Sequence, residues 1–216
     1  MKKTILSALI GATVLVPAVA QAELSANVAA TSNYLWRGME QTGGAAAISG
    51  GIDYAAESGF YAGTWASNAS WAEGMTYELD LYAGYGGSAG GFDYDVGFVY
   101  FAYPDETSGD ADFSEVYASV SKNGFTVGLA VLASGEGGDF GDTVYLSADY
   151  ATTVAKDAEL AFHVGNYSGD WLAEDSTDIG VTLSKDAFTF GISKLSQDGG
   201  DEDLKVYVSY AVDFAL

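Results

Sequence analysis

Alternation of apolar and polar residues repeats in twelve short segments after residue 22, separated by gaps that are short and long in turn. In the last segment every second residue from Leu204 to Leu216 is apolar, and Tyr207 is the main exception among the residues between them. A period of two predicts a β-strand with one apolar face and one polar face. A β-sandwich would not show such a regular alternation of loop length, so the pattern favours a closed barrel.

The predicted strands are joined by two classes of connection. Tight turns, of which Asn123-Gly124 carries the strongest hairpin signal, alternate with longer loops that are acidic and rich in Gly or Ser. This alternation is typical of bacterial outer-membrane barrels, which place the turns on the periplasmic side and the loops outside. We predict strands at residues 24–36, 45–56, 60–71, 75–86, 92–103, 113–122, 125–134, 143–154, 158–167, 176–184, 187–196 and 204–216.

The N-terminus has the three parts of a secretory signal peptide. Lys2 and Lys3 supply the positive start, residues 5–16 the apolar middle, and Ala20-Gln21-Ala22 the cleavage site. The apolar stretch is too short to cross a bilayer as a helix. We therefore predict a signal peptide at residues 1–22 and one domain at residues 23–216, an all-β, transmembrane, antiparallel, up-and-down β-barrel of about 12 strands.

Charge and composition narrow the classes of partner. Lys and Arg number 8 against 30 Asp and Glu, which gives a formal net charge of −22. Such a surface excludes nucleic acid, because phosphate binding needs clustered Lys and Arg, and it favours cations near the protein. Acidic disordered chains are poor in aromatic residues, whereas this chain has 15 Tyr, 11 Phe and 4 Trp. It has no cysteine, so closure of the barrel must replace disulfides as the source of stability.

Strand parity assigns one face to lipid and the other to the lumen. Outward positions include Ile48, Leu81, Val127 and Phe188. Charges are nearly absent from that face, because a charge at the membrane midplane costs about 2–4 kcal/mol. Inward glycines such as Gly191 leave room for inward tyrosine rings, and Tyr34 and Trp36 fall near a predicted strand end, where aromatic girdles belong. The predicted pore-lining residues on the inward face are Arg37, Asp53, Glu78, Asp80, Asp93, Asp95, Glu115, Asp149, Glu159 and Asp178.

Several stretches of the chain point to one family. Residues 32–38 read SNYLWRG and are followed by Gln41-Thr42, and residues 59–68, 77–85 and 92–97 read GFYAGTWASN, YELDLYAGY and FDYDVG. Over residues 24–120 the chain resembles the TorF-type porin family of Gram-negative bacteria. The resemblance implies an outer-membrane β-barrel, suggests a pore and supplies no substrate. The final strand also resembles the signal that barrel-assembly machinery reads, although it ends on Leu216 rather than on an aromatic residue.

Two carboxylate pairs lie on neighbouring predicted strands. Glu78 with Asp80, and Asp93 with Asp95, are spaced two residues apart and so share the inward face. We expect them to gather on one wall as a cation-attracting patch, the kind of charged lining that sets selectivity. A purely structural polar wall is the alternative, and a glycosidase-like acid pair is disfavoured because nothing else marks a sugar cleft.

Two cationic or titratable residues stand out among the inward acids. Arg37 can act as a constriction charge, but a buried bidentate pair with an acid across the lumen is favoured. His163 is the chain's only histidine, and Gly165 rather than a serine follows it on the same face. A hydrogen-bonded lumen histidine is therefore favoured over a catalytic base, which would need a nucleophile in reach.

Carboxylates are dense in the loops at residues 105–112 and 198–203. Such oxygens can bind calcium or magnesium and bridge to lipopolysaccharide phosphates. Neither loop has the ligand spacing of a helix-flanked calcium loop, and residues 137–142 resemble only one copy of a calcium-binding repeat. We therefore assign no metal and no cofactor, and treat both loops as solvated.

The function that these patterns predict is passive diffusion. We predict a porin-like channel of the outer membrane for small solutes or ions, leaning towards cations through its acidic lumen, and not an enzyme. Its predicted partners are outer-membrane lipid, lipopolysaccharide, the barrel-assembly machinery and the diffusing solutes. A structural or adhesive barrel with a plugged lumen is the main alternative, and a barrel enzyme is a weaker one. The inward rings expected to narrow the bore are Tyr82, Phe101, Tyr103, Tyr117, Tyr145 and Tyr207.

Overall fold

The computed structural model describes residues 22–107, 109, 111–169, 171, 174–197 and 203–216. The predicted signal peptide lies outside the described residues except for Ala22. The strands are β1 Glu23–Thr31, β2 Leu35–Trp36, β3 Met39–Glu40, β4 Ala47–Ala55, β5 Phe60–Asn68, β6 Tyr77–Ala89, β7 Phe92–Ala102, β8 Phe113–Lys122, β9 Phe125–Gly135, β10 Thr143–Thr153, β11 Glu159–Gly169, β12 Ser176–Lys185, β13 Phe188–Gln197 and β14 Lys205–Ala215. Among the described residues one 3-10 turn, Ala155–Asp157, lies between β10 and β11.

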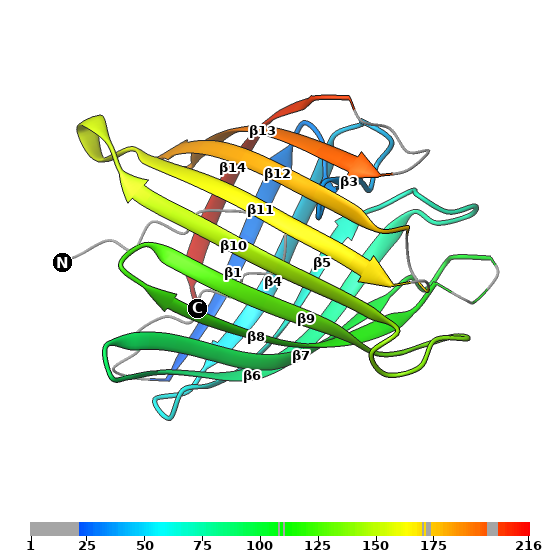
Figure 1. Ribbon diagram of the computed structural model, residues 1–216, viewed down its shortest axis with the longest axis horizontal. Helices are drawn as coiled ribbons and strands as arrows, with labels where there is room; N and C mark the ends of the chain where they lie inside the picture. Colours follow the sequence, from blue (N-terminus) through cyan, green and yellow to red (C-terminus); the bar gives the residue numbers. More distant parts are fainter. Residues whose placement is uncertain (1–21, 108, 110, 170, 172–173, 198–202) are drawn as a thin grey trace.

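Twelve strands close into an antiparallel barrel, as the alternation predicts (Figure 1). Every strand pairs with its neighbour in the chain, and β1 closes the ring by pairing with both β4 and β14. The tight turns and both ends of the described chain lie at one end of the barrel, and the longer loops lie at the other (Figure 1). No helix among the described residues is long and apolar enough to cross a membrane.

The outer face of the barrel is apolar and its inner face is polar. Ile48 is 68% exposed, and Leu81, Val127 and Phe188 are exposed on the same outward parity. The carboxylates of Glu78 and Asp95 occupy the opposite parity and are buried. This distribution is the reverse of a soluble β-protein, in which the apolar face forms the core.

Inward tyrosines lie over glycines of the neighbouring strand, which confirms the predicted use of these glycines. A Cβ atom added to Gly191 would lie 2.1 Å from Cζ of Tyr207, its partner across β13 and β14. Gly97 stands in the same relation to Tyr117, with a separation of 2.4 Å. The missing side chain of each glycine therefore provides the space that the ring occupies.

Three predicted boundaries are wrong by three residues or more, and one is the end of the strand predicted at residues 60–71, because β5 ends at Asn68. The first predicted strand, residues 24–36, is too long, because β1 ends at Thr31 and the chain then turns into the barrel. The amide of Ser32, just after β1, still donates to the carbonyl of Val208 on β14, and beyond this residue the chain leaves the wall. The gap between the strands predicted at residues 75–86 and 92–103 is also too long, because β6 continues to Ala89 and only Gly90 and Gly91 turn, both with positive φ.

The loop between β5 and β6 is tied to the loop between β7 and β8. The hydroxyl of Thr76 donates to Asp105, and the Thr76 amide lies 3.1 Å from Oδ2 of the same carboxylate. These hydrogen bonds, the hydroxyl's first, lower the pKa of Asp105 below its ordinary value. A lowered pKa means that the tie is intact above that ordinary value and is lost as the pH falls through the lowered one.

Replacing Asp105 with asparagine is therefore expected to loosen this tie at neutral pH. The amide of Thr76 should exchange its hydrogen faster, because the charged acceptor is gone. Hydrogen exchange followed by mass spectrometry measures this, with the Gly138 amide of another loop, bonded to the Gly135 carbonyl, as a reference. Unchanged exchange at Thr76 in the variant would contradict the assignment.

Candidate pore and the hairpin within it

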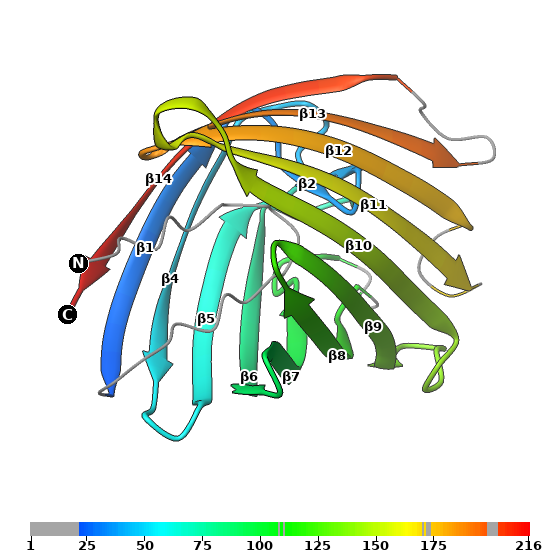
Figure 2. The ribbon, with the colours of Figure 1, turned by 60° about the vertical axis from the view of Figure 1, so that its left-hand side comes forward.

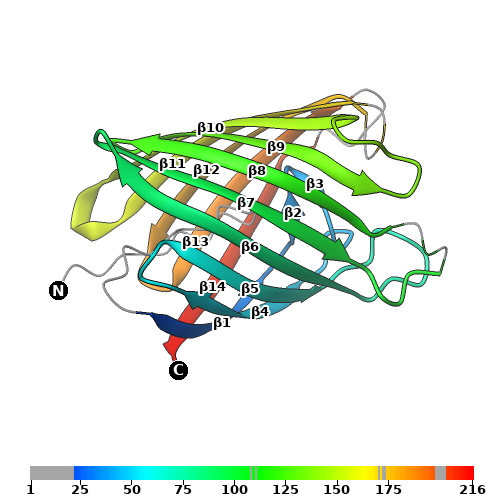
Figure 3. The ribbon, with the colours of Figure 1, turned by 90° about the horizontal axis from the view of Figure 1, so that it is seen from below.

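Residues 32–44, which we call the lumen hairpin, fold into the barrel instead of continuing its wall. β2 and β3 pair through Leu35–Glu40 and Trp36–Met39, and Arg37 and Gly38 form the turn with φ values of 50° and 80°. Figures 2 and 3 show these two short strands inside the ring of barrel strands, towards the end that carries the long loops.

The lumen hairpin reaches across the bore. Tyr34 donates a hydrogen bond of 2.8 Å to Glu78 on β6. At the opposite side, a Cβ atom added to Gly38 would lie 2.8 Å from Cβ of Asp178 on β12. Strands β6 and β12 are diametrically opposed in the closed ring. The hairpin therefore bridges the lumen from wall to wall.

Aromatic rings pack the hairpin against the inner wall. The ring centroid of Trp36 lies 6.0 Å from those of Phe101 on β7, Phe113 on β8 and Tyr167 on β11. Tyr34 lies edge-on to Trp65 at 5.6 Å. The prediction that Tyr34 and Trp36 belong to a lipid-facing girdle is therefore wrong, because both are buried in this internal cluster. The six rings expected to face inward do lie on the lumen face, and four of them are buried, namely Phe101, Tyr103, Tyr145 and Tyr207.

Arg37 forms the predicted bidentate pair. Its Nη1 and Nη2 donate to Oε1 and Oε2 of Glu115 at 2.7 and 2.6 Å, and the two side chains are 8% and 4% exposed. The guanidinium also stacks on the rings of Trp36 and Tyr145, at 4.2 and 4.3 Å from their centroids. A planar, buried guanidinium matched to a carboxylate fixes the tip of the hairpin firmly.

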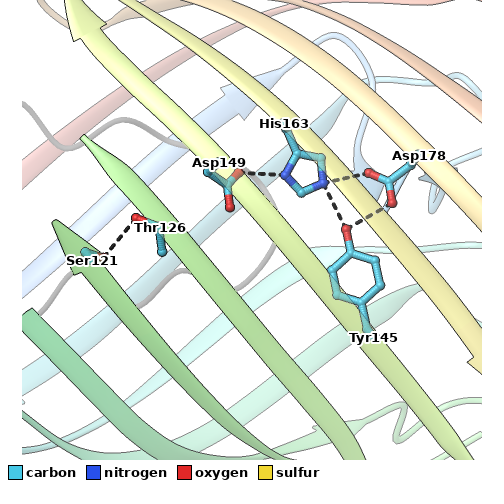
Figure 4. A network of polar contacts seen from close by, with 6 residues as sticks. All are labelled: Ser121, Thr126, Tyr145, Asp149, His163 and Asp178. Atoms are coloured by element: carbon cyan, nitrogen blue, oxygen red, sulfur yellow. Dashed lines mark hydrogen bonds and ion pairs between the residues drawn. The ribbon is translucent and has the colours of Figure 1, made fainter. Parts of the chain in front are cut away.

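His163 joins three residues of the wall next to that tip (Figure 4). Its Nδ1 lies 2.6 Å from Oδ1 of Asp149, and its Nε2 lies 2.8 Å from Oδ2 of Asp178. Tyr145 donates to Asp178 at 2.9 Å and also lies 2.9 Å from Nε2 of His163. The hydrogen bonds predicted for this histidine are present, and they connect β10, β11 and β12 beneath the hairpin.

The two carboxylate pairs share one wall but do not gather at one place. Asp80 lies opposite Phe101, whereas Asp95 lies opposite Gly86 and Asp93 opposite Ser88. Six residues of strand separate the Asp80 and Asp95 levels, about 20 Å at the usual rise per residue. The expected cluster of four acids is therefore wrong, because hairpin pairing sends the second pair towards the turn end.

The remaining acids occupy distinct levels of the lumen. Asp53 accepts hydrogen bonds from Tyr82 and from Asn27, and Asp95 accepts one of 2.8 Å from Tyr61. Glu159 is the half-buried first residue of β11. Whether these residues line an ion path stays a prediction. The described residues hold no group of three or more His, Asp or Glu that could bind a metal ion.

Comparison with known proteins gives a family and a fold. The model of a family described as "Bacterial protein of unknown function (Gcw_chp)" matches residues 17–214. The sequence matches no curated protein. The KdgM porin is 11% identical with a TM-score of 0.58, over 89% of this chain and 99% of that one. The KdgM porin in complex with disordered oligogalacturonate is also 11% identical, with a TM-score of 0.55 over 90% and 99% of the two chains. The fold is therefore that of an outer-membrane porin.

Proposed function

This chain belongs to the Gcw_chp family of bacterial proteins of unknown function, and we propose that it is a porin-like channel of the outer membrane for passive diffusion of small cationic solutes. The observation that carries the proposal is the closed barrel with an apolar outer face and acidic residues inside. The resemblance to TorF-type porins supports the same function. The predicted signal peptide and the C-terminal strand support export and insertion by barrel-assembly machinery next to lipopolysaccharide.

The balance of inward charges supports a preference for cations. Three inward bases oppose the acids of the lumen, and each has an acidic partner. His163 pairs with Asp149 and Asp178. Arg37 is paired with Glu115, and Nζ of Lys205 lies 3.6 Å from Oε1 of Glu40. Oligogalacturonate, present in one KdgM complex, is an anion. A lumen with an excess of carboxylates repels anions, so we propose a cargo of opposite charge for this chain.

Planar-bilayer recording of the purified protein in a salt gradient tests this function. The reversal potential should show cation preference, and replacing Asp53 and Asp213 with asparagine should move that potential towards zero. These two inward carboxylates lie within electrostatic reach of each other on the turn side of the hairpin. Glu73→Gln, in an exposed loop, is the control that changes charge outside the bore. Equal selectivity in all three proteins would contradict the proposal.

The lumen hairpin favours a second candidate, a structural barrel whose bore stays closed. Its bridge from β6 to β12 and its aromatic packing would block diffusion if the hairpin never moves. That candidate gives no current in the parent protein under any condition, and current appears only in variants that release the hairpin. Bilayer recording therefore separates the two functions.

A further inference from the structure

The lumen hairpin packs against a part of the inner wall that we call its seat. The seat contains two buried carboxylates, which are two residues apart on β6. Glu78 is 1% exposed and Asp80 is 8% exposed. Glu78 accepts a hydrogen bond of 2.8 Å from the phenol of Tyr34, and the phenol of Tyr103 faces it. Oδ1 of Asp80 is buried and has no hydrogen-bond partner among the described residues. In the strand register Asp80 lies between Trp65 and Phe101.

The ion pairs of the described residues do not include this carboxylate pair. The bases Arg37, His163 and Lys205 pair with other acids. The titratable groups that face the pair are phenols: Tyr34 from the hairpin, Tyr103 from the loop after β7 and Tyr82 from β6 itself. Burial, followed by the charges of Glu78 and Asp80, raises the pKa of Tyr34 well above its ordinary value. Tyr34 therefore keeps its proton and cannot neutralise a carboxylate.

Two neighbouring carboxylates that are removed from water cannot both stay ionised without a counter-charge. A hard metal ion would need six or more oxygen ligands, and the described residues form no such group. A proton is the remaining neutraliser, and it also gives Asp80 a donor. In an open, water-filled lumen both groups would be ionised at neutral pH.

We propose that the lumen hairpin is a displaceable plug that seats when the Glu78–Asp80 pair takes up a proton. This inference rests on the proposed function, because the displaced state is the one that would conduct. Acidification closes the bore, and a rise in pH ionises the pair and releases the hairpin. One proton taken up on seating changes the ratio of seated to displaced hairpin by up to about tenfold per pH unit.

The hairpin has features of a segment with two positions. Gly43 and Gly44, both exposed with positive φ, join it to the wall strand β4. Its seat leaves Oδ1 of Asn33 as well as Oδ1 of Asp80 buried without a hydrogen bond, which weakens the seated state. Arg37 holds the tip in place and keeps its charge throughout the pH range of proteins, so the pair on β6 supplies the response to pH.

Cysteine labelling tests the displacement without relying on current. The chain has no cysteine, so Leu35→Cys places one thiol on the buried side of the hairpin and Ala45→Cys places another at an exposed site. The full-length protein in lipid vesicles is labelled with a maleimide between pH 6 and 8.5. Because both thiols respond to pH chemically, the ratio of their labelling rates isolates movement of the hairpin.

The ratio for Leu35→Cys over Ala45→Cys should rise with pH by several-fold across this range. In the Glu78→Gln/Asp80→Asn background, which keeps the pair neutral, the ratio should stay low and flat. His163→Gln tests the other titratable group near the hairpin tip and should retain the rise. A flat ratio in the parent, or a rise that survives in Glu78→Gln/Asp80→Asn, would overturn the proposal. Heat-modified migration in gels confirms that each variant has formed its barrel.

Ion flux through the same vesicles separates this inference from the proposed function. Labelling and flux that rise together support both. Labelling that rises with pH while the vesicles remain impermeable supports the moving hairpin and rejects the channel. Flux that is independent of pH, with flat labelling, supports the channel and rejects the proton-coupled plug.

Discussion

Replacing Glu115 with alanine is expected to displace the lumen hairpin and to raise the conductance of the barrel. In the parent protein the guanidinium of Arg37 donates two hydrogen bonds to the carboxylate of Glu115. The variant leaves this guanidinium buried without its counter-charge. Removing one partner of a buried ion pair costs about 3–5 kcal/mol. Each 1.4 kcal/mol is a factor of about ten, so the ratio of displaced to seated hairpin should rise by at least about 100-fold. Single-channel recording at neutral pH measures the change.

The double variant Arg37→Ala/Glu115→Ala provides the matched control. It removes both charges, so no unpaired ion is left in the seat and the hairpin should be displaced less often than in Glu115→Ala. Glu73→Ala, at an exposed loop position, should leave the conductance unchanged. A Glu115→Ala barrel that conducts no more than the parent would show that this ion pair does not hold the hairpin in the lumen.

Replacing Gly191 with alanine is expected to destabilise the barrel by about 1–3 kcal/mol, the usual cost of overpacking. The added Cβ atom would enter the ring of Tyr207, which is buried. Gly180→Ala is the control on the adjacent strand, where the nearest atom would lie 3.6 Å away in ordinary contact. The temperature at which each barrel loses its compact migration in gels measures the difference. Equal temperatures for the two variants would contradict the claim that the Tyr207 ring occupies the space next to Gly191.

The strands could be predicted because their signals are local. Period-two alternation and turn residues such as Asn123-Gly124 act over a few residues, and the structure has positive φ at both. The lumen hairpin could not be predicted in this way. Tyr34 and Trp36 continue the alternation of β1, so their sequence looks like more strand, and rings on distant segments of the wall hold them inside the barrel.

The site shows the same division between local and distant signals. A buried bidentate pair for Arg37 could be predicted, because an inward cation among many acids must find a partner. Its identity depends on the path of the hairpin, which brings the guanidinium to Glu115 on β8. The isolation of Asp80 could not be predicted either, because its neighbours Trp65 and Phe101 come from two other strands.

The packing of inward tyrosines over glycines limits which parts of such a barrel can change during evolution. Each of these rings fills the space left by a glycine on the neighbouring strand, so neighbouring strands are fixed relative to each other. The circumference of the barrel therefore resists widening or narrowing. Permeability must then be tuned by the inserted thirteen residues and the side chains that they touch. Exchange of the lumen hairpin between relatives should transfer the cargo preference while the barrel wall stays the same. Gene shuffling with ion-flux screening would detect such a transfer.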